Sequence, residues 1–162
     1  MDAEKARAFL LKLPHVAETM QWGENLVYWV ADKAIGGKMF AVINLGPGGK
    51  TVISFAAGPE RYADLLENDG VIPAPYLARA HWVALERWAA IPPAELAELL
   101  KAACAAIFEK LPRRTKDVLA TSPASRRKIL AERKELLAQR APASKQNSKR
   151  RSETRKQRSN RS

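Results

Sequence analysis

The sequence predicts an α+β fold with a basic C-terminal extension. Three runs rich in β-forming residues follow one another between short turns, which is typical of an antiparallel meander. Amphipathic helical patterns stand before and after those runs. We therefore expect an antiparallel sheet, made of a meander plus a further strand, packed by N-terminal and C-terminal helices. The expected α+β domain spans residues 2–116, and the basic extension spans residues 117–162.

The first predicted helix begins after Asp2, whose carboxylate can cap it. Its apolar residues fall at helical spacing and are Ala6, Phe9, Leu10 and Leu13. Pro14 ends the pattern. We interpret residues 18–23 as a connector that finishes in a turn at Trp22-Gly23.

The meander is predicted from residues 26–30, 38–45 and 51–55, which are rich in branched and aromatic residues. Residues 32–37 form the first connecting turn. Residues 46–49, with the sequence Gly-Pro-Gly-Gly, form the second and carry the strongest turn signal in the chain.

The further strand is predicted in the stretch 71–88, between two helices. Two prolines in its first five residues force an extended backbone, and residues 81–85 form a strand-like run. The helix before it covers residues 59–68. The helix after it runs from 93 to 110, ends at Pro112-Arg113-Arg114, and has an apolar face made of Leu96, Leu99, Leu100, Ala103, Ile107 and Leu111.

Several short motifs stand in a fixed order along the domain. The central one consists of Pro75-Tyr76-Leu77, Arg79 and Trp82-Val83. The others are Leu13-Pro14-His15-Val16, Gln21-Trp22-Gly23, Gly37-Lys38-Met39-Phe40-Ala41, Gly58-Pro59-Glu60, Leu99-Leu100 and Leu111-Pro112. In order and spacing, over residues 3–111, they resemble the MmcQ/YjbR-like family of small bacterial proteins.

The resemblance implies a compact α+β domain of the CyaY/frataxin-like kind. It also implies DNA binding, by analogy between this fold and paired winged elements. The chain departs from the family at His15, where glycine is common, and at Ala103-Cys104, where a Ser-Tyr pair is common. These departures leave the implied fold intact and put any role of that pair in doubt.

The positive charge is concentrated in the last quarter of the chain. Residues 1–120 contain 14 Lys and Arg against 14 Asp and Glu, whereas residues 121–162, the basic arm, contain 14 against 3. A helix is expected over residues 124–139, followed by a disordered tail over residues 141–162. Because such a segment repels itself unless a polyanion neutralises it, the expected partner is nucleic acid, specifically DNA bound without sequence preference. An anionic membrane surface is the alternative, although the arm lacks Trp and Phe.

Nucleic-acid contacts are expected at cations in three places. The hairpin ends and the strand around Trp82 contribute Lys33, Lys38, Lys50, Arg79 and His81, and the extension contributes Arg113, Arg114, Arg126, Arg127, Lys128, Lys149, Arg150 and Arg151. For the lysines the competing interpretation is ordinary solvated hairpin ends, and for Arg79 it is a solvated strand edge. For His81 it is a half-exposed strand residue rather than a stacking or phosphate contact.

The tryptophans are expected to be structural. Alternation in the strand sends Trp82 into the core. Trp22, Trp29 and Trp88 are interpreted as core or core-rim residues rather than stacking platforms. Cys104 lies on or beside the apolar stripe of its helix and is expected to be a small buried hydrophobe rather than a reactive thiol.

No enzyme class is indicated. His15, His81 and Cys104 lack metal-ligand spacing, and residues 46–50 lack the Gly-Lys-Ser/Thr ending of a phosphate loop. We therefore expect a non-catalytic protein without metal or cofactor. A single cysteine, the absence of a secretory signal and the absence of an apolar stretch of ~20 residues indicate a cytoplasmic protein. The competing function is a protein- or small-ligand-binding module that uses the tail as a nonspecific electrostatic anchor.

Overall fold

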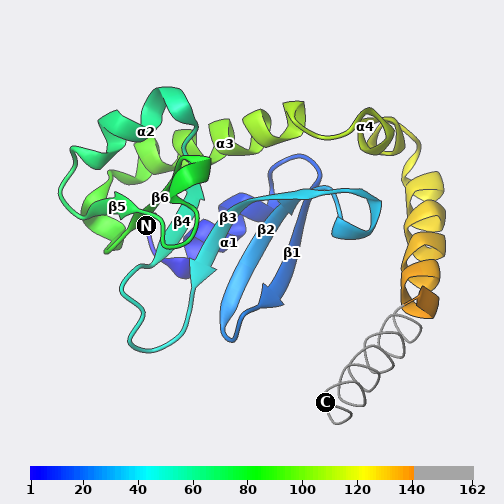
Figure 1. The fold of residues 1–162 in the computed structure, drawn as a ribbon, viewed down its shortest axis with the longest axis horizontal. Helices are drawn as coiled ribbons and strands as arrows, with labels where there is room; N and C mark the ends of the chain where they lie inside the picture. Colours follow the sequence, from blue (N-terminus) through cyan, green and yellow to red (C-terminus); the bar gives the residue numbers. More distant parts are fainter. Residues whose placement is uncertain (141–162) are drawn as a thin grey trace, which may run out of the picture. The chain divides into compact units, whose positions relative to one another are not determined.

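The computed structural model describes residues 1–140, and its folded unit runs from Met1 to Ala120 (Figure 1). The helices of this unit are α1 (Ala3–Leu11), α2 (Pro59–Leu66), α3 (Pro93–Glu109) and α4 (Arg113–Leu119). The strands are β1 (Val16–Gln21), β2 (Asn25–Val30), β3 (Lys38–Asn44), β4 (Ile53–Ala56), β5 (Val71–Pro73) and β6 (Trp82–Leu85). Short 3-10 turns lie at η1 (Lys33–Ile35), η2 (Ala78–Ala80) and η3 (Trp88–Ala90).

The described strands form one sheet with the order β1-β2-β3-β4-β6-β5, and all neighbours are antiparallel. The predicted α+β class, the meander and the joining of the Trp82 strand to it are confirmed. β6 pairs with β4, and Trp82 lies opposite Ala56. His81 precedes this strand in a left-handed conformation with φ 60°, so the strand begins one residue later than predicted.

The meander has four strands because β1 precedes it. The interpretation of residues 18–23 as a connector was wrong: residues up to Gln21 pair in register with β2. β1 carries polar side chains on both faces, so it has no apolar alternation to reveal it. Glu18 accepts hydrogen bonds from Arg7 and Tyr28 on one face, and Thr19 accepts one from the Trp29 indole on the other.

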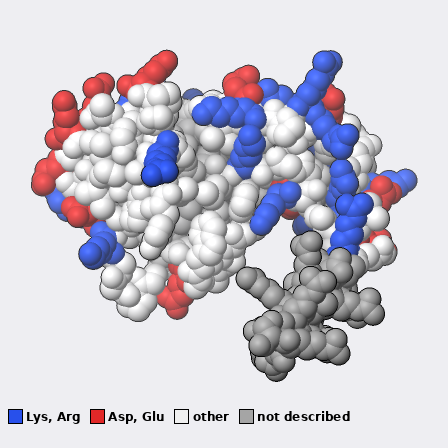
Figure 2. All heavy atoms as spheres, in the orientation of Figure 1, with Lys and Arg blue, Asp and Glu red and all other residues white. Residues whose placement is uncertain are grey.

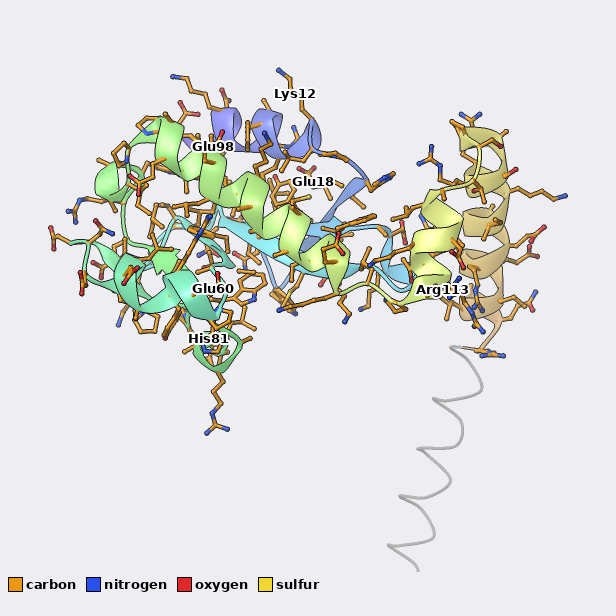
Figure 3. The ribbon with its side chains drawn as sticks, turned by 90° about the horizontal axis from the view of Figure 1, so that it is seen from above. Lys12, Glu18, Glu60, His81, Glu98 and Arg113 are labelled. Atoms are coloured by element: carbon orange, nitrogen blue, oxygen red, sulfur yellow. The ribbon has the colours of Figure 1, made fainter. Side chains whose placement is uncertain are left out.

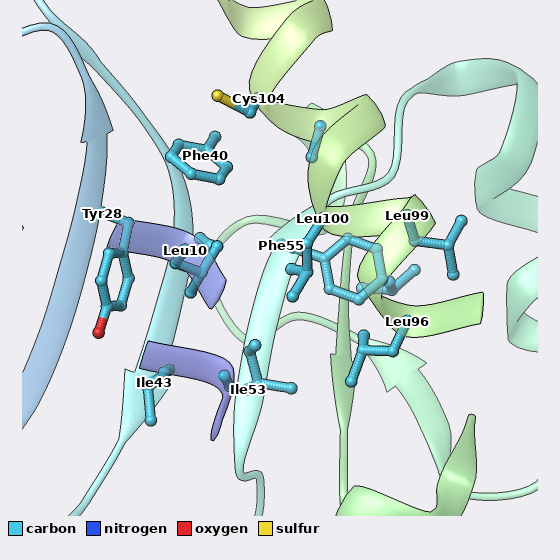
Figure 4. Packing of buried hydrophobic residues seen from close by; sticks show 14 of the residues in the cluster. Leu10, Tyr28, Phe40, Ile43, Ile53, Phe55, Leu96, Leu99, Leu100 and Cys104 are labelled. Carbon is cyan, nitrogen blue, oxygen red and sulfur yellow. The ribbon is translucent and has the colours of Figure 1, made fainter. Parts of the chain in front are cut away.

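One face of the sheet is covered by α1 and α3, which lie side by side across it (Figure 3). Asp2 caps α1 as predicted, because its carboxylate accepts a hydrogen bond from the Lys5 N–H. Between these helices and the strands lies the main core, a close-packed set that includes Leu10, Tyr28, Phe40, Ile43, Ile53, Phe55, Leu96 and Leu100 (Figure 4). Each of these eight side chains is fully buried.

The opposite face of the sheet carries a second, smaller cluster. Its buried members in the described chain are Val27, Trp29, Val42, Ala74, Trp82 and Ala84. Ala74 and the partly buried Leu77 come from the segment between β5 and β6, so this segment rather than a helix covers part of the face. We call this side the open face.

The predicted end of α3 is correct, but the chain continues as another helix. α4 follows Pro112 directly and was not predicted. Its one buried residue is Thr115, whose hydroxyl donates a hydrogen bond to the Ile35 carbonyl at 2.6 Å. At Gly36, where φ is 89°, an added Cβ would lie 2.6 Å from the Thr115 hydroxyl. The folded unit therefore extends to Ala120.

The second unit begins at Thr121, and its residues 123–140 are helical. Most of its side chains are exposed, including Leu136 and Leu137. The predicted tail over 141–162, with Lys149, Arg150 and Arg151, lies outside the described residues. No helix within residues 1–140 has the length and apolarity needed to cross a membrane.

Candidate nucleic-acid interface

The cations predicted at the hairpin ends fall at opposite ends of the sheet. Lys33 and Lys38 flank the connection between β2 and β3, whereas Lys50 lies in the connection between β3 and β4. Lys33 places its ammonium 5.6 Å from the centre of the Trp29 ring. Lys38 donates a hydrogen bond to the Lys110 carbonyl at the C-terminal end of α3. All three lysines are exposed, but the fold does not bring them together.

Arg79 and His81 lie near the start of β6. Arg79 is exposed on η2. The His81 ring meets the edge of Tyr62, with ring centroids 5.4 Å apart, and its carbonyl accepts hydrogen bonds from Ala57 and Gly58. These contacts fix His81 beside α2 (Figure 3).

The surroundings of α2 are acidic, and Figure 2 shows red side chains gathered over that part of the molecule. In the sequence, α2 and the turn that follows it carry Glu60, Asp64, Glu67 and Asp69 against Arg61, and Arg87 pairs with Asp69. A phosphate backbone is repelled by such a cluster. Arg113 and Arg114 are exposed on α4, and Figure 3 shows Arg113 at the other end of the folded unit from His81.

The tryptophans divide into buried and exposed ones. Trp82 is 5% exposed and Trp29 is 8% exposed, so their predicted burial is confirmed, and Trp88 is half-buried. The interpretation of Trp22 as a core or core-rim residue was wrong, because its side chain is 64% exposed. Trp22 occupies the tight loop between β1 and β2, outside both clusters of buried residues in the described chain.

A hollow of about 530 Å³ opens on the open face next to Trp22. The sheet contributes Val42, Asn44 and Ser54, the connection between β3 and β4 contributes Thr51, and the segment after β5 contributes Pro75, Tyr76 and Leu77. The described residues that line it are all uncharged. Its volume lies in the range of small-molecule sites. In the sequence Trp22-Gly23 indicates a turn and Pro75-Tyr76 belongs to the family motif, but neither pattern indicates that the two line one hollow.

A second hollow adjoins the first and shares five of its lining residues. It continues past the Gly46–Gly49 loop to Glu24 and Lys50. Lys50 is therefore the predicted hairpin lysine that stands at the margin of the hollow. Glu24 offsets its charge in part, so the margin is not strongly positive.

Both exposed aromatic residues at the hollow have an unusual backbone. Trp22 has φ 50° and Tyr76 has φ 65°, in the left-handed region that bulky L-residues rarely adopt. Tyr76 is fully exposed, with a relative accessibility of 105%. Among the described residues these are the large aromatic side chains that face solvent.

The two departures from the family pattern lie together elsewhere in the fold. His15 and Cys104 line one hollow of about 350 Å³ between α3 and the end of α1, and the His15 ring stacks on Phe108. Burial raises the pKa of the Cys104 thiol to about 11, as expected for a small buried hydrophobe. Within the described residues no group of three or more His, Cys, Asp or Glu is placed to hold a metal ion.

The described part of the basic arm carries its cations mainly on one side of a helix. Arg126, Arg133 and Arg140 recur every seven residues and so form one row along the helix, and Arg127 and Lys134 both lie about a quarter turn to one side of that row. Lys128 falls on the opposite side of the helix, with Glu132 and Glu135. Figure 2 shows blue side chains along this helix. Arg133, Lys134 and Arg140 were not among the predicted contacts, although their spacing from Arg126 could have shown the row.

Comparison with known proteins places the fold. The YjbR family model matches residues 11–104. The crystal structure of the Deinococcus radiodurans protein DR2400, which carries the family-model domain DUF419, is similar with a TM-score of 0.59 and 22% sequence identity. That similarity covers 75% of this chain and 89% of that chain, and it supports the fold alone. No curated protein is detectably similar in sequence.

Proposed function

The chain belongs to the YjbR family, and from that premise we propose that it is a non-catalytic nucleic-acid-binding protein of the cytoplasm. Its target is DNA, and its basic arm supplies most of the affinity. The folded unit positions the protein on the DNA and contributes little to the electrostatic attraction. The arm binds phosphates without sequence preference, because clustered cations recognise charge and not base edges.

The observation that carries this proposal is the separation of charge between the two units. The folded unit, residues 1–120, has no net charge, and the basic arm has a net charge of +11. Long-range attraction of a polyanion therefore comes from the arm alone. Within the folded unit the predicted cations lie apart, and His81 stands beside the acidic α2.

The test is a salt titration of duplex DNA binding by the full chain. If about six phosphates are neutralised, the logarithm of the binding constant should fall with the logarithm of salt concentration with a slope near −5. Deletion of residues 121–162 should flatten that slope. The matched control is the full chain with Lys33→Ala and Lys38→Ala, which should keep the slope within about one unit of the parent. An unchanged slope after the deletion would refute a role for the arm.

A binding module for a protein or small ligand is the competing function, and the hollow of about 530 Å³ favours it. The two functions differ in what residues 1–120 do with DNA. Titration of this unit with labelled duplex and single-stranded DNA at low salt separates them. Failure to bind either at protein concentrations of order 100 μM, the weak end of nonspecific affinities, would remove the folded unit from DNA recognition. If the full chain also fails to bind, the binding module becomes the leading function.

A further inference from the structure

We propose that the hollow on the open face receives an unpaired DNA base, which stacks on Trp22 and Tyr76. This inference rests on the proposed DNA-binding function and adds a preference for single-stranded DNA. The hollow is formed by the loop between β1 and β2, by β3 and β4, and by the segment after β5.

The first argument is the coincidence of exposed aromatic rings at one place. Trp22 is 64% exposed, Tyr76 is fully exposed, and both line the same hollow although they are distant in the sequence. Burying such rings would stabilise the fold by removing apolar area from water, yet no described element covers them. Flat aromatic surfaces presented to solvent are the usual platform for bases of single-stranded nucleic acid.

The second argument is the chemistry of the lining. The lining combines polar and apolar side chains. Amide and hydroxyl groups come from Asn25, Asn44, Thr51 and Ser54, and apolar surface comes from residues such as Val42 and Leu77. The Asn44 amide is held in place because it donates to the Thr51 hydroxyl at 2.6 Å and to the Thr51 carbonyl at 3.1 Å. With no charged residue in the lining, a phosphate or a metal ion has no counter-charge there. A flat, uncharged heterocycle with hydrogen-bonding edges fits both kinds of side chain.

The third argument is the position of Lys50. This lysine lies at the margin, where the hollow continues past the loop between β3 and β4, and Glu24 at the same margin offsets its charge only in part. A base in the hollow leaves its sugar and phosphate outside, on the side where Lys50 stands. The basic arm of the same chain supplies the long-range attraction.

The test compares single-stranded oligothymidylate with duplex DNA on the full chain at fixed salt. Tyr76→Ala and Trp22→Ala should each weaken binding of the single strand about 5- to 100-fold, the usual loss of one stacking partner. Duplex binding and its salt slope should stay unchanged, since paired bases are not available for the hollow. Tyr76→Phe should restore the affinity, because the ring remains. Binding should also quench tryptophan fluorescence in the parent but much less in the Trp22 variant.

The matched control is Met20→Ala. Met20 is also 64% exposed, but it follows Glu18 on the strand and so lies on the helix-covered face. Tyr76→Ala removes a side chain that buries no area, so its folding is not at risk, and melting curves check the Trp22 variant. Unchanged single-strand binding in both variants, or an equal loss for duplex DNA, would overturn the hollow as a base site. A normal salt slope in the same proteins would leave the proposed function intact, whereas failure of the parent to bind any DNA would overturn that function itself.

Discussion

The two faces of the sheet are built in different ways. On one face α1 and α3 cover the strands, and the core there contains fully buried side chains such as Tyr28, Phe40 and Phe55. On the open face the described buried cluster consists of five strand residues, Trp82 among them, and of Ala74 from the irregular segment between β5 and β6. That face also keeps a hollow of about 530 Å³.

The difference shows how stability and recognition are divided between the faces. The helix-covered face gains its stability from continuous apolar burial. The open face buries enough to hold the sheet together and leaves Trp22 and Tyr76 in water. A binding surface needs accessible groups, and a sheet with one helix-covered face can offer them without opening its main core.

The sharpest test of this division is the substitution of one large side chain on each face. Phe55→Ala and Trp82→Ala should each reduce the free energy of unfolding by about 3–5 kcal/mol, with Phe55→Ala at the upper end because helices pack over it. Urea unfolding of both variants measures the two losses.

The control for Trp82 is DNA binding under conditions where the variant remains folded. If Trp82 is structural, the folded Trp82→Ala variant should still bind DNA with the salt slope of the parent. If Trp82→Ala unfolds like the parent but no longer binds DNA, Trp82 is a contact residue and the open face is more exposed in solution than its 5% accessibility indicates.

Most of the helix-covered face could be predicted from the sequence. α3 shows its buried stripe as a helical period, and β2 and β3 show dense β-forming residues between turn signals. Strict alternation fails at one point, because a bulge opposite Tyr28 and Trp29 gives β3 an extra residue at Phe40. Such a bulge depends on how two strands pair and leaves no local mark.

The rest depends on contacts between distant residues. β1 was missed because its polar side chains find partners elsewhere in the fold, such as Arg7 for Glu18. α4 was missed because the contacts that hold it are distant in the sequence: Thr115 donates a hydrogen bond to the Ile35 carbonyl, 80 residues away, and Leu119 packs against the main core. The hollow was missed for the same reason. Trp22 and Tyr76 are distant in the sequence, and they line one hollow only because the segment after β5 packs on the open face. The charge separation, by contrast, is a property of composition and could be read directly.

A polar link on the helix-covered face predicts a pH dependence of stability. Glu18 accepts hydrogen bonds from the Arg7 guanidinium at 2.9 Å and from the Tyr28 hydroxyl at 2.8 Å. The hydrogen bond from Arg7 is the main reason that the pKa of Glu18 is lowered from its ordinary value of 4.5. A lowered pKa stabilises the fold above the unfolded value, and this stabilisation is lost as the pH falls through the folded value.

Glu18→Gln should therefore destabilise the protein by about 1 kcal/mol at pH 7, because the link is partly screened by solvent. The difference from the parent should stay constant down to about pH 5 and shrink below pH 4.5. Urea unfolding at pH 7, 5, 4 and 3 measures it. Glu98→Gln, an exposed residue of α3, is the control and should track the parent throughout. A difference that grows as the pH falls would contradict the assignment.

The smallest expected effect concerns the backbone of Trp22 on the open face. Its φ of 50° is unfavourable for most L-residues, while asparagine adopts such a conformation readily. Trp22→Ala and Trp22→Asn remove the ring equally, and the Asn25 amide still donates to the carbonyl of residue 22. The asparagine variant should then be more stable than the alanine variant by about 0.5–1 kcal/mol. At Met20, which lies in an extended strand, asparagine should bring no such gain over alanine. Equal stability of the two Trp22 variants would contradict this prediction. It would mean that the left-handed backbone of residue 22 costs no free energy of folding, so the exposed position of the ring would not be maintained against strain.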